Sequence, residues 1–285
     1  MDAKTIAVIG AGTMGNGIAQ VLAAGGLEVV MTDIDDSALQ RGVNAVTKSL
    51  DRLLSKQKIS EGDKKNILGR IKTATKLDAV ADCDVVVEAA TENVDLKLRI
   101  FADLDRIAKP AAILASNTSS ISLTRIAGAT KRPAQVIGMH FFNPVPVMQL
   151  VELIRALQTS DATFETVKAL TRQVGKTPVE VKNSPGFVAN RILLPMLNEA
   201  VFCLYEGLAK PEDIDTVMKL GMAHPMGPLA LADLIGLDTC LSILQVLYDG
   251  FKDPKYRPCP LWREKVDAGH LGRKSGRGFF DYAKP

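Results

Sequence analysis

The sequence predicts an α/β protein in which a mostly parallel sheet domain with a helical hairpin insertion is followed by an all-helical domain. Over the first ninety residues, short apolar segments alternate with helical patterns, which is typical of βαβ units on a parallel sheet. A glycine-rich turn joins the first expected strand to the first expected helix. After about residue 183 only helical periodicity continues. We therefore expect two domains, residues 1–183 and 184–285.

The sheet domain is predicted from a series of apolar strands. In chain order the expected elements are the strand Ile6–Ile9, the helix Thr13–Ala24 and the strands Glu28–Met31, Asp84–Glu88, Ala111–Ala115 and Val136–His140. Parallel strands place their carboxyl ends at one edge of a sheet, where ligands bind in such folds. Residues that follow these strands are therefore the first candidates for a site.

A helical hairpin is expected at about residues 36–75, which are too many for one crossover helix. The helical pattern breaks at Ile59–Asp63, where Ser60 and Asp63 have the spacing of a capping box. We expect the hairpin to project from the sheet and to carry the basic residues Arg52, Lys56, Lys58, Lys64 and Lys65. A solvated charged face accounts for the same pattern.

The second domain is predicted from helical spacing alone. Phe187–Gly207 is apolar at helical intervals, and Gly207 is the expected stop. Pro211–Leu220 and Pro228–Phe251 continue the helical pattern. The turn-forming residues Asn183–Gly186 mark the expected domain boundary.

Composition excludes several classes of protein. The chain has 285 residues, with 35 Lys and Arg against 32 Asp and Glu, so its net charge of +3 predicts no nucleic-acid partner. No apolar run reaches the ~18 residues needed to cross a bilayer, and the N-terminus lacks a signal-peptide pattern. The four cysteines have no metal-ligand spacing, so we expect no metal site and a reducing, cytoplasmic location.

A dinucleotide site is predicted where the first strand meets the first helix. Gly10 permits a tight turn, Gly12 lets the backbone approach a pyrophosphate, and Gly15 allows close packing of helix on strand. Asp33 follows the second strand, where a carboxylate accepts hydrogen bonds from ribose hydroxyls and repels a 2′-phosphate. The nearest arginine, Arg41, is too far along the chain to be an obvious phosphate partner. These residues predict a Rossmann-type domain that binds NAD rather than NADP, although Asp33 also fits a turn or an N-cap.

A histidine and a glutamate are the candidate acid–base pair. His140 ends a strand, so it is expected at the carboxyl edge, where it can take a hydroxyl proton as a hydride leaves for a nicotinamide. Glu152 lies in the apolar stretch Gln149–Ile154, and a carboxylate is costly to bury there unless it is paired. Such a pair would orient the imidazole. A structural histidine and a glutamate on an exposed helix face are the alternatives.

Two polar clusters are further candidates. Ser116–Ser120 follows the strand Ala111–Ala115, and Asn190 lies near the start of the first helix after the domain boundary. A capping turn explains the first cluster, and a polar position on an amphipathic helix explains the second.

Taken together and in order, these motifs resemble the L-3-hydroxyacyl-CoA dehydrogenase family, in particular its short-chain bacterial members. The resemblance covers essentially the whole chain. It rests on the segments Val8–Gly15, Ser116–Ser120, Met139–Met148, Pro185–Arg191, His224–Pro228 and Gly272–Tyr282.

The resemblance implies an NAD-dependent (S)-3-hydroxyacyl-CoA dehydrogenase that interconverts 3-hydroxybutyryl-CoA and acetoacetyl-CoA in fatty acid or butanoate metabolism. By motif, His140 is the general base and acid, Glu152 orients it, and Ser119 and Asn190 hold the substrate oxygens. Lys56 and Arg52 of the hairpin are implied to meet coenzyme A, and the helical domain to bind substrate and form a homodimer. The implied cofactor pocket comprises Gly10, Gly12, Thr13, Met14, Gly15, Asp33, Glu92, Lys97, Asn117 and Asn143.

Two other functions are compatible with the motifs. A related dehydrogenase of a non-CoA hydroxy acid, such as a sugar acid, would share the fold and would not depend on Lys56. A non-catalytic, crystallin-like NAD-binding protein is the second alternative, and the intact set of His140, Glu152, Ser119 and Asn190 argues against it.

Overall fold

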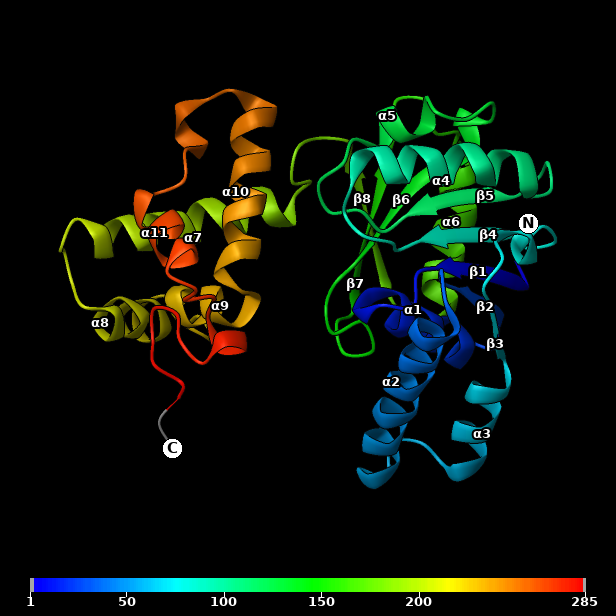
Figure 1. Cartoon of the computed structure of the whole chain (residues 1–285), viewed down its shortest axis with the longest axis horizontal. Coiled ribbons are helices and arrows are strands. Elements are labelled where there is room, and N and C mark those ends of the chain that lie inside the picture. Colours follow the sequence, from blue (N-terminus) through cyan, green and yellow to red (C-terminus); the bar gives the residue numbers. More distant parts are fainter. Residues whose placement is uncertain (1–2, 284–285) are drawn as a thin grey trace. The chain divides into compact units, whose positions relative to one another are not determined.

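The structure, a computed structural model, describes residues 3–283. It divides into two compact units, Met1–Asn183 and Ser184–Pro285. The first unit, called the sheet unit below, holds all the strands of the sheet, and the second, called the helical unit, is built from helices (Figure 1).

Within the described residues, eight strands form one sheet in the order β3-β2-β1-β4-β5-β6-β7-β8. Neighbouring strands are parallel, except that β6 and β7 are antiparallel, so the predicted mostly parallel sheet is confirmed. The chain crosses over beside β1, whose neighbours are β2 and β4, and this reversal opens a crevice at the carboxyl ends. The strands are β1 Thr5–Ile9, β2 Glu28–Thr32, β3 Ile71–Ala74, β4 Val85–Glu88, β5 Ile113–Ser116, β6 Val136–Phe141, β7 Leu150–Arg155 and β8 Thr177–Lys182.

Helices pack on this sheet, so its central strands are buried on both faces. In β4, for example, every residue is buried. The apolar side chains of β1, β2 and α1 form one core with those of α2 and α6. The helices of the sheet unit are α1 Thr13–Ala24, α2 Asp36–Ser55, α3 Glu61–Gly69, α4 Val94–Ile107, α5 Leu123–Ala127 and α6 Asp161–Gln173, with short 3-10 turns at Leu77–Val80 and Pro133–Gln135.

The helical hairpin consists of α2 and α3 and projects from the sheet (Figure 1). Its capping box is present: the Asp63 amide donates to Ser60 Oγ at 3.1 Å, and the Ser60 amide donates to Asp63 Oδ2 at 2.9 Å. The expected end at residue 75 is wrong, because α3 stops at Gly69 and Ile71–Ala74 forms β3 beside β2. Two of the four residues of this edge strand are exposed, so it lacks the apolar run from which strands are predicted.

The helical unit contains α7 Ala189–Tyr205, α8 Pro211–Thr216, the π-helical η3 Val217–Gly221, α9 Pro228–Ile235, α10 Leu237–Phe251 and α11 Pro260–Asp267, with 3-10 turns at Pro254–Tyr256 and Arg273–Ser275. The helical pattern Pro228–Phe251 is not one helix. It bends by 98° at Gly236, whose φ of +105° suits only glycine. The core surrounds the fully buried Trp262, whose Nε1 donates to Asn198 Oδ1 at 2.9 Å.

Between residues 3 and 283 no single helix is both long and apolar enough to cross a membrane, and only α9 and α10, counted together across their bend, reach that length and composition. In the same part of the chain no group of three His, Cys, Asp or Glu side chains is arranged to hold a metal ion.

Candidate active site

The glycine turn between β1 and α1 is shaped by two close contacts and one open position. Gly10 has a φ of +100°, and a Cβ there would lie 2.8 Å from the carbonyl oxygen of Ala89. A Cβ on Gly15 would collide with the carbonyl oxygen of Gly10. At Gly12, by contrast, no atom lies within 4 Å of an added Cβ, and no side chain caps the helix that begins at Thr13. The turn therefore presents open backbone and uncapped N–H groups, the features that bind a pyrophosphate.

Asp33 follows β2 and lies beside this turn. Its carboxylate accepts hydrogen bonds from the amides of Ala11 and Ile34, each at 2.7 Å. The N-cap of α2 is Asp35, so the N-cap alternative for Asp33 is wrong. Asp33 and Gly12 line two adjacent cavities of about 450 and 410 Å³. This carboxylate is thus held where a ribose next to the pyrophosphate would meet it.

Arg41 is nearer to this site than its sequence position indicates. It lines the same cavity as Asp33, and its guanidinium donates to Ser37 Oγ. Arg41 lies on the same face of α2 as Ser37, because residues four apart are neighbours on a helix surface. Ser37 is in the first turn of that helix, so Arg41 lies near its start and near Asp33. The sequence signal for this position was the spacing of Ser37 and Arg41 on a helix that starts just after Asp33.

His140 and Glu152 form a buried pair on neighbouring antiparallel strands. They are directly opposite in the register of β6 and β7, and Nδ1 of His140 lies 2.8 Å from Oε2 of Glu152. The residues are 7% and 1% exposed. Glu152 is therefore not on an exposed helix face. Its bond to Nδ1 fixes the orientation of the ring, and the Phe142 ring packs 4.6 Å from the imidazole, centroid to centroid.

The serine-rich loop after β5 lies at the same edge of the sheet. Asn117 Oδ1 accepts from the Phe141 amide at 2.9 Å, which ties this loop to the strand that carries His140. The Ser119 and Ser120 amides donate to Glu92 Oε1, each at 3.1 Å. The loop is therefore fixed both to β6 and to the segment that follows β4.

Three further residues of the implied cofactor pocket follow β1 or β6. Thr13 lines the cavity that also contains Asp33 and Gly12. Met14 is half-buried and packs against the core of the sheet unit. Asn143 follows the end of β6, is exposed, and joins Pro144 through a cis peptide bond.

Glu88, for which the sequence predicts no role in the site, also belongs to this edge. It ends β4 opposite Ser116 of β5, and its carboxylate lies 2.5 Å from Nζ of Lys97. The signal was the same as for His140, a polar residue that ends an apolar strand. Lys97 is itself buried, with its ammonium between Glu88 and Glu92. The positive charge of Lys97 is therefore paired with these two carboxylates.

The remaining candidates lie elsewhere in the chain. Arg52 and Lys56 are exposed one helical turn apart at the end of α2. Lys64 pairs with Asp51 at 2.6 Å across the hairpin, so it is less available to a ligand than those two. Asn190 is the second residue of α7, in the helical unit, and is half-buried.

A dinucleotide turn and an oriented histidine at one edge of a doubly wound sheet are typical of dehydrogenases that use a nicotinamide dinucleotide. Comparisons with known proteins define the family. Residues 5–184 match the model of the 3-hydroxyacyl-CoA dehydrogenase NAD binding domain, and residues 186–282 match that of the 3-hydroxyacyl-CoA dehydrogenase C-terminal domain. The chain belongs to the 3-hydroxyacyl-CoA dehydrogenase family.

Individual relatives are similar over nearly their full length. The chain is 57% identical to a probable 3-hydroxybutyryl-CoA dehydrogenase of Bacillus subtilis, over 99% of this chain and 98% of that protein. It is 55% identical to the 3-hydroxybutyryl-CoA dehydrogenase of Bradyrhizobium diazoefficiens, over 99% and 97%. The crystal structure of (S)-3-hydroxybutyryl-CoA dehydrogenase from Ralstonia eutropha is 60% identical, with a TM-score of 0.97 over 99% of this chain and 100% of that one.

Proposed function

We propose that the chain is an NAD-dependent (S)-3-hydroxybutyryl-CoA dehydrogenase, which interconverts 3-hydroxybutyryl-CoA and acetoacetyl-CoA. The observation that carries this proposal is the buried His140–Glu152 pair at the carboxyl edge of the dinucleotide-binding sheet. Relatives that are 55% to 60% identical over nearly the whole chain are named for this reaction.

The sheet unit has the features that NAD requires. The open backbone at Gly12 and the uncapped start of α1 fit the pyrophosphate, and Asp33 fits a ribose without a 2′-phosphate. When bound, NAD supplies the acceptor for the hydride from C3 of the substrate.

His140 moves the proton of the reaction. Glu152 engages Nδ1, so the exchange of a proton with the substrate hydroxyl falls to Nε2. The Glu152 carboxylate then stabilises the imidazolium that forms. Oxidation of the hydroxyl releases a proton, so reduction of acetoacetyl-CoA is favoured as pH falls.

Other residues are proposed to bind the substrate. Ser119 and Asn190 hold its oxygens, and Lys56 with Arg52 meets the phosphates of coenzyme A. Support for the second role comes from the exposure of both side chains one turn apart on α2, which suits charge-assisted hydrogen bonds to phosphate.

The test is the loss of NADH absorbance on addition of acetoacetyl-CoA, with NADPH and free acetoacetate as parallel controls. Rapid oxidation of NADH with the thioester alone is the expected result. Turnover of free hydroxy or keto acids in preference to the thioester would favour the dehydrogenase of a non-CoA acid. No turnover with either would favour the non-catalytic protein.

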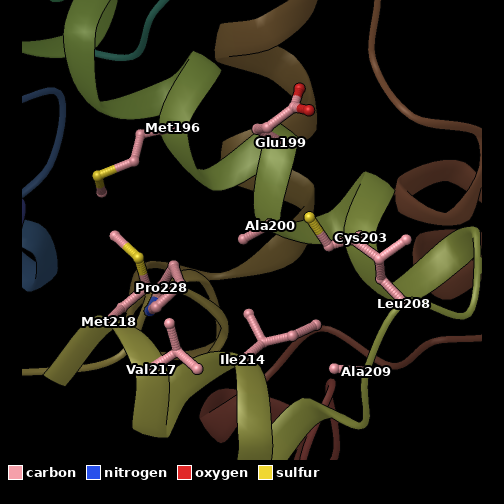
Figure 2. A pocket seen from close by; sticks show the side chains of 10 residues that line it. All are labelled: Met196, Glu199, Ala200, Cys203, Leu208, Ala209, Ile214, Val217, Met218 and Pro228. Atoms are coloured by element: carbon pink, nitrogen blue, oxygen red, sulfur yellow. The ribbon is translucent and has the colours of Figure 1, made fainter. Parts of the chain in front are cut away.

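We further propose a homodimer formed through the helical unit. An apolar cavity of about 460 Å³ lies between α7 and the α8–η3 segment (Figure 2). Leu208 and Val217 line it and are 73% and 61% exposed. Ile192, Leu220 and Met222 add exposed apolar surface on or next to the same elements. Apolar surface gathered in this way marks a protein contact, and a second copy of this chain would cover it.

A cytoplasmic location and a role in fatty acid or butanoate metabolism remain predictions from the sequence.

A further inference from the structure

A buried polar network lies where β4 and β5 end. Glu88 is fully buried, and its Oε1 accepts from the Ala90 amide at 2.7 Å and from Lys97 Nζ at 2.5 Å. Its Oε2 accepts from Ser116 Oγ at 2.6 Å. The carboxylate thus has partners on three sides, which a buried charge requires.

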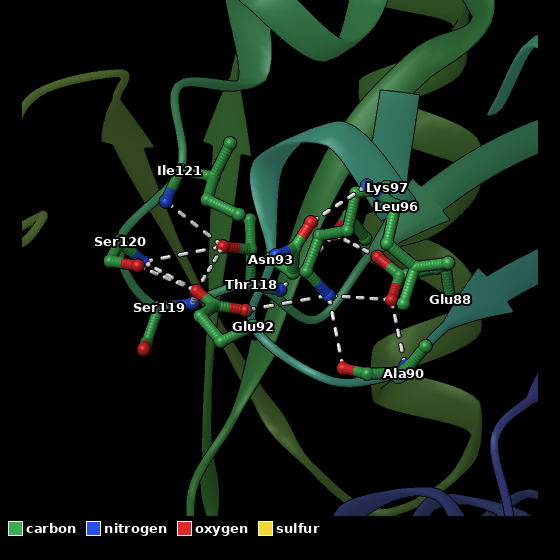
Figure 3. A network of polar contacts seen from close by, with 11 residues as sticks. Glu88, Ala90, Glu92, Asn93, Leu96, Lys97, Thr118, Ser119, Ser120 and Ile121 are labelled. Carbon is green, nitrogen blue, oxygen red and sulfur yellow. Dashed lines mark hydrogen bonds and ion pairs between the residues drawn. The ribbon is translucent and has the colours of Figure 1, made fainter. Parts of the chain in front are cut away.

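Lys97 connects this carboxylate to a second one. It lies on α4 and is 1% exposed. Its Nζ also donates to the carbonyl oxygen of Ala90 at 3.2 Å and pairs with Glu92 Oε2 at 3.4 Å. Figure 3 shows the ammonium between the two carboxylates.

Glu92 connects the network to the serine-rich loop. Its Oε1 accepts from Thr118 Oγ1, from the Ser119 amide at 3.1 Å, and from the amide and hydroxyl of Ser120. The Glu92 side chain is 38% exposed, and the partial loss of water around it would by itself raise its pKa. The charge of Lys97 and these hydrogen bonds outweigh that effect and hold the pKa below its ordinary value. The Ser119 side chain points away from Glu92 (Figure 3).

We propose that Glu88 is a positioning residue for the reaction: through Lys97 and Glu92 it fixes the loop that presents the Ser119 hydroxyl to the substrate. This inference rests on the proposed function and on the role proposed for Ser119. Its physical basis is preorganisation, because a hydroxyl held in one place by its backbone loses less freedom when substrate binds.

A double-mutant cycle tests this role. Initial rates of NADH oxidation by acetoacetyl-CoA are measured for the wild type, Glu88→Gln, Ser119→Ala and the double variant. Glu88→Gln is expected to lower kcat/KM roughly tenfold in the wild type and hardly at all in the Ser119→Ala background, because residues that act as one unit are not additive. A purely structural role for Glu88 would lower kcat/KM equally in both backgrounds and would overturn the proposal.

Asp84→Asn is the matched control. Asp84 precedes the opposite end of β4 and has a similar set of partners, namely Lys109 Nζ at 2.6 Å and the amides of Lys4 and Thr5. It is expected to lower the melting temperature without changing kcat/KM. If it changes kcat/KM as Glu88→Gln does, the effect is a general one of β4 and the proposal fails.

Two further measurements separate the possible failures. If Glu88→Gln does not fold, Thr118→Val leaves the buried pair intact but removes one donor to Glu92 and the hydroxyl that accepts from the Ser120 and Ile121 amides. It loosens the same loop and is expected to show the same coupling to Ser119→Ala; additive effects would overturn the proposal. A wild type that fails to oxidise NADH with acetoacetyl-CoA contradicts the proposed function itself. An active wild type in which Ser119→Ala has no effect contradicts this inference and the role proposed for Ser119, but not the proposed dehydrogenase activity.

Discussion

At the scale of single residues, the chemistry depends on an imidazole oriented by one carboxylate. His140→Ala is expected to lower kcat by about 10²–10⁴-fold, the usual contribution of general acid–base catalysis. The affinity for NADH should change little, because the glycine turn and Asp33 are untouched. Steady-state rates and a fluorescence titration with NADH measure the two effects. A variant that keeps most of the wild-type kcat would contradict the assignment.

The pKa of Glu92 makes a second prediction at this scale. Because that pKa is lowered from its ordinary value of 4.5 in the folded chain, the ionised carboxylate stabilises the fold above pH 4.5. This contribution is lost as pH falls through the lowered value. Melting temperatures of the wild type and Glu92→Gln should therefore differ at neutral pH and converge in acid. A difference that is constant with pH would show that charge is not the cause.

At the scale of elements, two glycines of the turn between β1 and α1 are expected to have different roles, Gly15 in packing and Gly12 in cofactor binding. Gly15→Ala is expected to lower the melting temperature, because its Cβ would collide with the Gly10 carbonyl oxygen. Gly12→Ala has open space, so it should fold normally and bind NADH more weakly, since the methyl group occupies the approach to the backbone. Thermal melts and NADH titrations of both variants check this pair. Equal effects on both properties would contradict it.

The hairpin α2–α3 is the element proposed to meet coenzyme A. Lys56→Glu should raise KM for acetoacetyl-CoA by roughly tenfold and leave kcat nearly unchanged, because the contact is remote from the reacting carbon. Arg106→Glu is the control, since this exposed residue lies in the last turn of α4 and not on the hairpin. Unchanged KM in Lys56→Glu would favour a substrate without coenzyme A.

At the scale of the whole molecule, the apolar surface of the helical unit predicts a dimer. The mass measured by light scattering should be twice the 30.6 kDa of the chain. The double variant Leu208→Asp and Val217→Asp should shift it toward the monomer, because two charges would be buried in the interface. Leu157→Asp, an exposed position of the sheet unit, should remain dimeric. A monomeric wild type would contradict the proposal.

Much of the fold and part of the site were predictable from local patterns. The glycine turn, the first strands and the capping box of Ser60 and Asp63 are properties of short segments, and each is present. The edge strand β3 and the bend at Gly236 were not predicted, because the first has no apolar run and the second interrupts a continuous helical pattern.

The sequence by itself determined the α/β class, the dinucleotide turn and the candidate residues, since periodicity and turn chemistry are local. Only the tertiary structure decided which polar residues meet. Glu152 faces His140 because β7 runs antiparallel to β6 in one particular register, and Glu88 reaches Glu92 only through the buried ammonium of Lys97. Strand register and side-chain burial depend on contacts between distant segments, which no local pattern specifies.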